Sequence, residues 1–156
     1  MKKIILMRHS YALSAMDSKV KNDDLRPLSP RGVEEAQDAV ILLKQRVAKI
    51  DRILTSTRAR ATETADIIGK AFNVKPEAYT ELCREQPITD LWAFIRKEVD
   101  EGSVLLAVGH NPDFSELVST LAGTHISLNP AEFAIFNFDN EFEKPELEPI
   151  NPQEEK

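Results

Sequence analysis

The sequence lacks cysteine pairs, an excess of positive charge and long apolar runs, and each absence excludes a class of protein. Cys83 is the single cysteine among 156 residues, which rules out an internal disulfide framework and a cysteine-based zinc finger. The 20 lysine and arginine residues are outnumbered by 26 aspartate and glutamate residues, and the net charge of −6 argues against general binding to nucleic acid or anionic membranes. No apolar run approaches the roughly 20 residues of a membrane helix.

The remaining composition is that of a globular protein. Apolar residues make up 42% of the chain, and a chain of this size can bury about 70% of its unfolded surface, so we expect one domain that folds without metal or disulfide. Residues 1–7 briefly imitate a signal peptide, but their apolar part stops at Arg8 and is too short for one. Together with the lone cysteine, this leads us to expect a cytoplasmic protein.

Negative charge and proline gather at the C-terminal end. Residues 141–156 contain six glutamates, two lysines and three prolines. Such a segment has too little apolar content to offset its own ordering entropy. We therefore expect a domain over residues 1–140 followed by an acidic, proline-containing tail over residues 141–156. The alternative is that Phe142, Leu147 and Ile150 hold this segment against the body.

Two periodicities alternate along the first 140 residues. Short apolar runs predict buried strands at residues 4–7, 53–54, 104–108 and 134–138. Apolar residues at steps of three and four predict helices after Ser29-Pro30, over residues 57–72, from a cap at Thr89, and after Asn111-Pro112. This alternation predicts an α/β fold, a three-layer α/β/α sandwich with a central, mostly parallel sheet. The polar stretch over residues 10–28 is long for a connection, and such loops are often functional.

Two histidines occupy equivalent places in this pattern. His9 and His110 each follow a predicted buried strand, and ligands bind at the carboxyl ends of strands in open α/β sheets. Arg8 precedes the first histidine. A guanidinium at the end of a buried strand is costly unless an anion meets it, and that anion is either a protein carboxylate or a phosphate.

Further arginines are predicted at the same edge of the sheet. Arg58 and Arg60 lie where the strand at residues 53–54 leads into a helix, and the N-terminus of a helix favours anions. Arg26 ends the long polar loop. The three histidines show no metal-ligand spacing, and no glycine-rich nucleotide-binding loop is present, so we expect neither a metal nor another cofactor. Arginine and histidine without a metal suit phosphoryl transfer through a covalent histidine.

Four segments resemble motifs of the histidine phosphatase superfamily, which includes phosphoglycerate mutases and acid phosphatases, and they occur in the family order. Met7–Ser10 resembles the RHG motif, with serine at the third position instead of glycine. Arg26–Gly32 is similar to the RPLxxxG stretch of the small bacterial SixA-type phosphohistidine phosphatases. Ser56–Ala65 resembles the SxxxRAxxTA segment, and Val108–Pro112 resembles the motif of the second histidine. The length also matches the small branch of the family.

The resemblance implies a role for each matched residue. His9 is the nucleophile that becomes phosphorylated. The residues that contact the phosphoryl group or the substrate are Arg8, Arg60 and His110, with Arg26 and Asn111 as further binding residues. Arg60, rather than Arg58, is in register with the family motif, because the alanine and threonine of the motif follow it at the correct spacing.

One departure from the family bears on the substrate. Ester-cleaving members use a carboxylate as general acid, and Arg84 stands where that acid is expected. Glu81 and Glu85 flank this position out of register, and the loop residues Asp23 and Asp24 are further candidates. An alkoxide leaving group needs a proton, whereas a phosphohistidine can already carry one and leave as neutral imidazole.

We therefore expect a phosphatase that works without metal, through a phosphohistidine intermediate on His9, and removes phosphate from protein phosphohistidine. A histidine-containing phosphotransfer domain is an example of such a partner, and nucleic acid and membranes are not expected partners. One alternative is a phosphatase for small phosphate esters. Another is a non-catalytic module that binds phosphate or a phosphoprotein.

Overall fold

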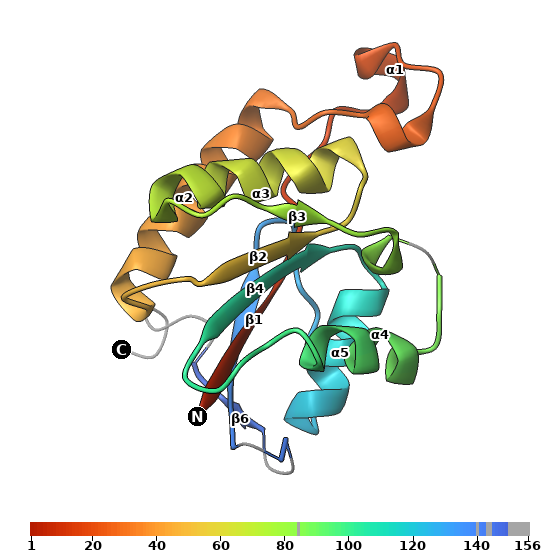
Figure 1. Ribbon diagram of the computed structural model, residues 1–156. Helices are drawn as coiled ribbons and strands as arrows, with labels where there is room; N and C mark the ends of the chain where they lie inside the picture. Colours follow the sequence, from red (N-terminus) through yellow and green to blue (C-terminus); the bar gives the residue numbers. More distant parts are fainter. Residues whose placement is uncertain (84, 140, 143–144, 150–156) are drawn as a thin grey trace.

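The computed structural model describes residues 1–83, 85–139, 141–142 and 145–149. Its centre is a six-stranded sheet in the order β3-β2-β4-β1-β5-β6 (Figure 1). The strands are β1 (Lys2–Arg8), β2 (Arg52–Thr55), β3 (Glu77–Ala78), β4 (Val104–Gly109), β5 (Phe133–Phe138) and β6 (Glu146–Leu147). The first four strands of that order pair in parallel, whereas β5 and β6 pair antiparallel, so the prediction of a mostly parallel sheet is confirmed.

Helices cover both faces of the sheet. The α-helices are α1 (Ala15–Ser18), α2 (Pro30–Arg46), α3 (Ala59–Phe72), α4 (Ile88–Arg96) and α5 (Asp113–Ala122), and two short 3₁₀ helices are η1 (Asp23–Leu25) and η2 (Thr80–Leu82). Helices α2 and α3 lie on one face, and α4 and α5 lie on the other (Figure 1). The predicted three-layer α/β/α sandwich is therefore confirmed. Among the described residues, no helix is long and apolar enough to cross a membrane.

The side chains of β1 show why the apolar run at residues 4–7 forms a central strand. Successive strand residues point to opposite faces. Ile4 and Leu6 belong to the core under α4 and α5, while Ile5 and Met7 belong to the core under α2 and α3. All four are fully buried. A strand covered on both faces needs this continuous apolar sequence, and each buried side chain contributes about 1.5–3 kcal/mol.

The helix starts were predicted with mixed success. Ser29 caps α2 as expected, because its hydroxyl accepts a hydrogen bond from the Gly32 N–H at 3.0 Å. Helix α3 begins at Ala59, two residues after the predicted Thr57. The predicted cap at Thr89 is wrong, since α4 begins at Ile88 and Pro87 precedes it. The Pro87 carbonyl accepts from the N–H groups of Asp90 and Leu91 at 3.0 and 3.2 Å, so Thr89 lies inside the first turn and not before it.

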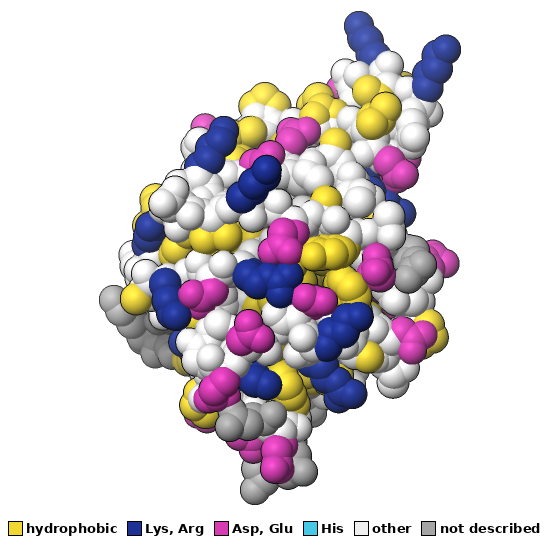
Figure 2. All heavy atoms as spheres, in the orientation of Figure 1, with side chains coloured by type: hydrophobic (Ala, Val, Ile, Leu, Met, Phe, Trp, Pro, Cys, Tyr) yellow, Lys and Arg dark blue, Asp and Glu magenta, His cyan; other side chains and the backbone are white. Residues whose placement is uncertain are grey.

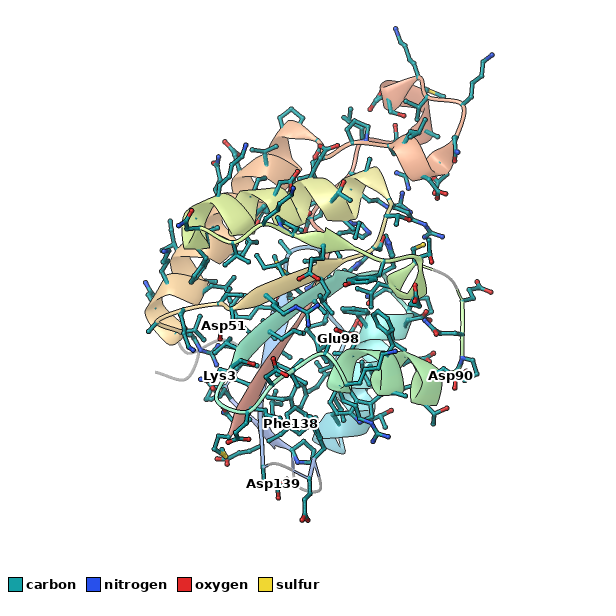
Figure 3. The ribbon with its side chains drawn as sticks, viewed as in Figure 1. Lys3, Asp51, Asp90, Glu98, Phe138 and Asp139 are labelled. Atoms are coloured by element: carbon teal, nitrogen blue, oxygen red, sulfur yellow. The ribbon has the colours of Figure 1, made fainter. Side chains whose placement is uncertain are left out.

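Polar contacts occupy the amino-terminal edge of the parallel strands. The Asp51 carboxylate accepts a hydrogen bond from the N–H of Val104 at 2.7 Å. Lys3 Nζ lies 3.0 Å from a carboxylate oxygen of Glu148. Figure 3 shows Lys3 and Asp51 at this edge of the sheet. The two histidines that follow β1 and β4 therefore lie at the opposite, carboxyl-terminal edge.

Part of the predicted tail contacts the body. The ring of Phe142 packs on Phe138 with centroids 5.2 Å apart, and Leu147 packs against the apolar core. These contacts support the alternative in which apolar residues hold the segment. Ile150 and the rest of residues 150–156 lie outside the described residues. The domain boundary at residue 140 stays a prediction.

Candidate active site

Parallel pairing of β1 with β4 brings the two histidines together. Arg8 pairs with Gly109 in this register, so the residue after each strand is a histidine at the same edge. The His9 N–H donates to the Gly109 carbonyl at 3.0 Å, which continues the ladder by one bond. The rings of His9 and His110 have centroids 5.0 Å apart and are tilted by 57°.

One hydrogen bond sets the tautomer of His9. Its Nδ1 lies 2.6 Å from the carbonyl oxygen of Ser10, and a carbonyl can only accept, so Nδ1 carries the proton. In the neutral ring, Nε2 then holds an unshared electron pair. The geometry therefore leaves Nε2 of His9 as a nucleophilic atom.

The turn after His9 is fixed by buried hydrogen bonds. The Ser10 N–H donates to Thr64 Oγ1 at 3.0 Å, and the Ser10 hydroxyl donates to the Gly32 carbonyl at 2.7 Å. A side chain at Gly32 would clash with the Tyr11 carbonyl oxygen, so glycine permits the close approach of α2 to this turn. Serine in place of the family glycine is thus accommodated by a hydrogen bond to α2.

His110 is held by Ser56, a motif residue for which the sequence analysis predicts no role. Its Nε2 lies 2.6 Å from the Ser56 hydroxyl, and both side chains are buried. The same hydroxyl accepts from the Arg58 N–H at 3.1 Å. Ser56 therefore orients the second histidine from the end of β2.

Arg8, at the end of β1, and Arg60, in α3, line the same cavity as the two histidines. Arg8 Nη1 donates to the Leu128 carbonyl at 3.0 Å, while Arg8 Nε is buried with no hydrogen-bond partner in the described part of the chain. Arg60, in the first turn of α3, is only 6% exposed and donates to the backbone and the carboxylate of Asp23 at 3.0 and 3.3 Å. A buried N–H group without a partner is a point where an anionic ligand can be bound.

Two further arginines, Arg26 and Arg58, line the same cavity. Arg26 donates to the Asp23 carboxylate at 2.7 Å and to the Leu13 carbonyl at 2.7 Å. Arg58 Nε lies 3.1 Å from the Asp24 carboxylate, without the geometry of a hydrogen bond. Asp23 and Asp24 of the polar loop thus pair with arginines and are not free groups.

The predicted residues converge on one cavity of about 270 Å³. Its lining is Arg8, His9, Ser10, Tyr11, Ala12, Arg26, Arg58, Arg60, His110, Asn111 and Pro130. Four arginines and two histidines line it, and no carboxylate does so among the described residues. A hollow of about 510 Å³ elsewhere on the surface has mixed charges and no histidine. The convergence of positive charge thus distinguishes the histidine cavity as an anion site.

Both imidazoles are neutral near pH 7. Burial is the largest cause that lowers the pKa of His9 to about 4, and the nearby arginines lower it further against the Ser10 hydrogen bond. Burial, then the neighbouring His9 and the arginines, lower the pKa of His110 to about 3. The pKa of Asp23 is also lowered, first by its hydrogen bond with Arg26, so this carboxyl is ionised.

These shifts predict an acid-sensitive site. In the free protein, the ring protons of both histidines should titrate well below pH 6.5 in an NMR pH titration, and inorganic phosphate should raise both midpoints because a bound anion favours imidazolium. The unfolded chain takes up these protons below about pH 6.5, so the free energy of unfolding should decrease as the pH falls toward 4. Midpoints near 6.5 in the free protein would contradict the described burial.

Asn111 lines the cavity, but its side chain makes local bonds. Its Nδ2 donates to the Leu128 carbonyl at 2.9 Å, and its Oδ1 accepts from the hydroxyl and N–H of Ser115 at 2.8 and 3.2 Å. These bonds fix the turn that leads into α5. A contact between Asn111 and substrate stays a prediction.

The predicted acid candidates do not reach the cavity. Glu81 accepts from the Thr80 hydroxyl and lines the separate hollow, and Glu85 does not line the histidine cavity. Arg84 lies outside the described residues. Asp113, which the sequence did not single out, has its pKa raised, first by burial and then by nearby carboxylates, but it does not line the cavity.

Metal ligation has no support from the donor set. Within residues 1–83, 85–139, 141–142 and 145–149, no three His, Cys, Asp or Glu side chains gather where they could hold a metal ion. The groups that line the site and can take part in chemistry are its imidazoles and guanidinium groups.

Comparison with known proteins finds a family model and relatives that match this chain in sequence and in fold. Residues 4–91 match the histidine phosphatase superfamily (branch 1). The chain is 30% identical to the phosphohistidine phosphatase SixA of Escherichia coli K12 over 122 residues, which cover 76% of this chain and 73% of that protein. A solved structure of the protein histidine phosphatase SixA complexed with tungstate superposes with a TM-score of 0.82 at 25% identity and covers 99% of both chains.

The fold is also shared with phosphatases of other substrates. A phosphoserine phosphatase from Entamoeba histolytica, solved with phosphoserine, has a TM-score of 0.72 at 16% identity and covers 97% of this chain and 98% of its own. At this identity the likeness concerns the fold alone.

Proposed function

The chain belongs to the histidine phosphatase superfamily, and from that premise we propose that this phosphatase removes the phosphoryl group from phosphohistidine on a protein. The observation that carries the proposal is the cavity itself. Two neutral imidazoles lie 5.0 Å apart among four arginines, and no described carboxylate lines the space. The likeness to proteins named phosphohistidine phosphatase supports the same substrate class.

In the first step, His9 Nε2 attacks phosphorus in line with the bond that breaks. The Nδ1 proton of His9 stays on its hydrogen bond to the Ser10 carbonyl. Arg8, Arg26 and Arg60 hold the phosphoryl oxygens, and preorganised donors of this kind stabilise the charge that is transferred. The substrate ring is protonated on its second nitrogen, so the broken P–N bond releases neutral imidazole.

The second step mirrors the first. Water attacks the phosphorus of phosphorylated His9, the new P–N bond breaks, and His9 leaves as a neutral ring that still carries its Nδ1 proton. The proton lost by water passes to a phosphate oxygen or to solvent. Both leaving groups are imidazoles, so neither step requires a carboxylic acid to donate a proton.

Hydrolysis of a phosphate ester would require a proton donor in the site. An alkoxide is a poor leaving group without a proton, and general acid catalysis contributes about 10²–10⁴-fold. Asp23 cannot supply that proton, because the arginines keep it ionised. Hydrolysis of small esters is the second candidate; it needs a proton donor, and Asp113, whose pKa is raised, does not line the cavity in this structure.

A paired turnover assay without added metal tests the proposal. The substrates are a phosphotransfer domain phosphorylated on histidine and a set of esters that includes phosphoserine. We expect kcat/KM for phosphohistidine to exceed that for the esters by at least about 10²-fold, the size of the missing acid catalysis.

Equal or faster ester turnover would overturn the proposal, and its loss in Asp113→Asn would identify the proton donor. Phosphate binding without turnover of either substrate would instead support a binding module. His9→Ala serves as the control that separates enzymatic release from spontaneous hydrolysis.

A further inference from the structure

The polar loop forms a projection beside the catalytic cavity. Residues 14–25, which we call the arm, include α1 and η1, and neither helix has a buried residue. In Figure 1 the arm stands away from the layered body near the start of α3. A segment that contributes nothing to the core and still keeps an ordered shape is a candidate for contact with another molecule.

The arm exposes apolar side chains that the fold does not use. Met16 is 85% exposed and Leu25 is 59% exposed. Methionine is flexible and polarisable, and it adapts to irregular apolar surfaces of partners. Single exposed apolar residues are common on protein surfaces, so what marks these two is their place on an arm beside the cavity.

The base of the arm is tied to the phosphoryl site. The Leu13 N–H donates to the Pro27 carbonyl at 2.9 Å, and Arg26 donates to the Leu13 carbonyl at 2.7 Å, so the two ends of the arm are clamped. Asp23 binds Arg26 and Arg60, and Asp24 pairs with Arg58. A protein that inserts a phosphorylated side chain into the cavity must therefore pass beside the arm.

The outer end of the arm has its own charge. Lys19 and Lys21 are exposed there against one carboxylate, Asp17. Figure 2 shows basic side chains extending from this projecting end, with apolar atoms beside them. The chain as a whole carries a net charge of −6, but this end of the arm is locally positive. Opposite charges attract across an interface, so this end would favour an acidic patch on a partner.

We propose that the arm is a docking site for the phosphorylated protein substrate, whose apolar surface packs on Met16 and Leu25 and whose acidic side chains face Lys19 and Lys21. The inference rests on the proposed function, since it assumes that the phosphorylated group belongs to a protein. The arm then contributes to recognition of that protein without touching the reacting atoms.

The double variant Met16→Ser/Leu25→Ser tests this assignment. We expect kcat/KM for the phosphorylated protein to fall by about tenfold or more, mainly through KM, because exposed contacts at an interface are lost. Turnover of free phosphohistidine should stay within about twofold. Ile41→Ser is the matched control, since Ile41 is 58% exposed on α2 outside the arm. Lys19→Glu/Lys21→Glu should also raise KM for the protein and weaken its dependence on salt.

Each other outcome has a distinct meaning. An equal loss on both substrates would show that the arm acts on the arginines and would overturn docking. Unchanged turnover of the protein substrate, or an equal loss in Ile41→Ser, would overturn it as well. If the wild-type chain hydrolyses free phosphohistidine but not the protein, docking and the protein substrate both fail, and only the transfer chemistry on His9 stands. If it hydrolyses neither, the proposed function itself fails.

Discussion

Replacing His9 by alanine is expected to lower turnover of a phosphohistidine substrate by at least about 10³-fold, because the variant has no atom that can accept the phosphoryl group. The turn should persist, since it depends on bonds of Ser10 to Thr64 and Gly32 and not on the imidazole. Phosphate binding should also persist through the arginines. Steady-state kinetics, with phosphate affinity measured by calorimetry, check both expectations.

A second histidine provides the control for His9. His125 is exposed and does not line the cavity, so His125→Ala should keep full turnover. If His9→Ala retained a tenth of the wild-type rate, covalent catalysis by His9 would be excluded. Loss of phosphate affinity together with folded circular dichroism would instead indicate that His9 only binds the anion.

Replacing Arg60 by lysine is expected to lower kcat/KM by about 10²-fold, although the charge is kept. Arg60 is 6% exposed and directs a planar guanidinium between Asp23 and the cavity. Lysine is a single point donor on a flexible stem and cannot make paired hydrogen bonds of the same geometry. The magnitude is that of removing one preorganised donor to the transition state.

Arg96→Lys is the matched control, because Arg96 is exposed at the end of α4 and outside the cavity. Inhibition by inorganic phosphate should weaken in Arg60→Lys and stay unchanged in the control. An Arg60→Lys enzyme within about threefold of the wild type would mean that charge alone, without the guanidinium geometry, suffices at this position.

The loop aspartates explain how four arginines can surround one small cavity. Like charges at such spacing repel, and burial lowers the pKa of Arg8 and Arg60, although both guanidinium groups remain protonated. Asp23 bridges Arg26 and Arg60, and Asp24 lies beside Arg58. The pairs neutralise part of the charge in the free protein while the buried Arg8 Nε keeps unused hydrogen-bonding capacity.

The sequence predicted the layers and the position of the histidines because these depend on local patterns. Continuous apolar runs identify strands that are buried on both faces, and the polar residues that interrupt them mark the functional edge of the sheet. The two-residue strands β3 and β6 are too short to give any pattern, so they were not predicted. The Thr89 cap failed because α4 begins one residue earlier, at Ile88, so Thr89 lies inside its first turn.

The network around the histidines could not be predicted in the same way. Asp23 meets Arg60 across 37 positions, and Ser56 meets His110 across 54. Such contacts depend on how separate elements are placed in space, and residue spacing carries no information about them. The family resemblance marked Ser56 and Thr64 as motif residues without giving them a role. The structure supplies the role, since Ser56 is hydrogen-bonded to His110 and Thr64 accepts from the Ser10 N–H.

Trapping the covalent intermediate tests the account most directly. The enzyme is mixed rapidly with a protein phosphorylated on histidine with labelled phosphate, quenched in alkali, which preserves phosphohistidine, and digested for mass spectrometry. We predict transient label on Nε2 of His9 that appears before inorganic phosphate and is absent from His9→Ala. Label on His110 or His125, or release of phosphate in the first turnover with no label on the enzyme, would contradict catalysis through His9.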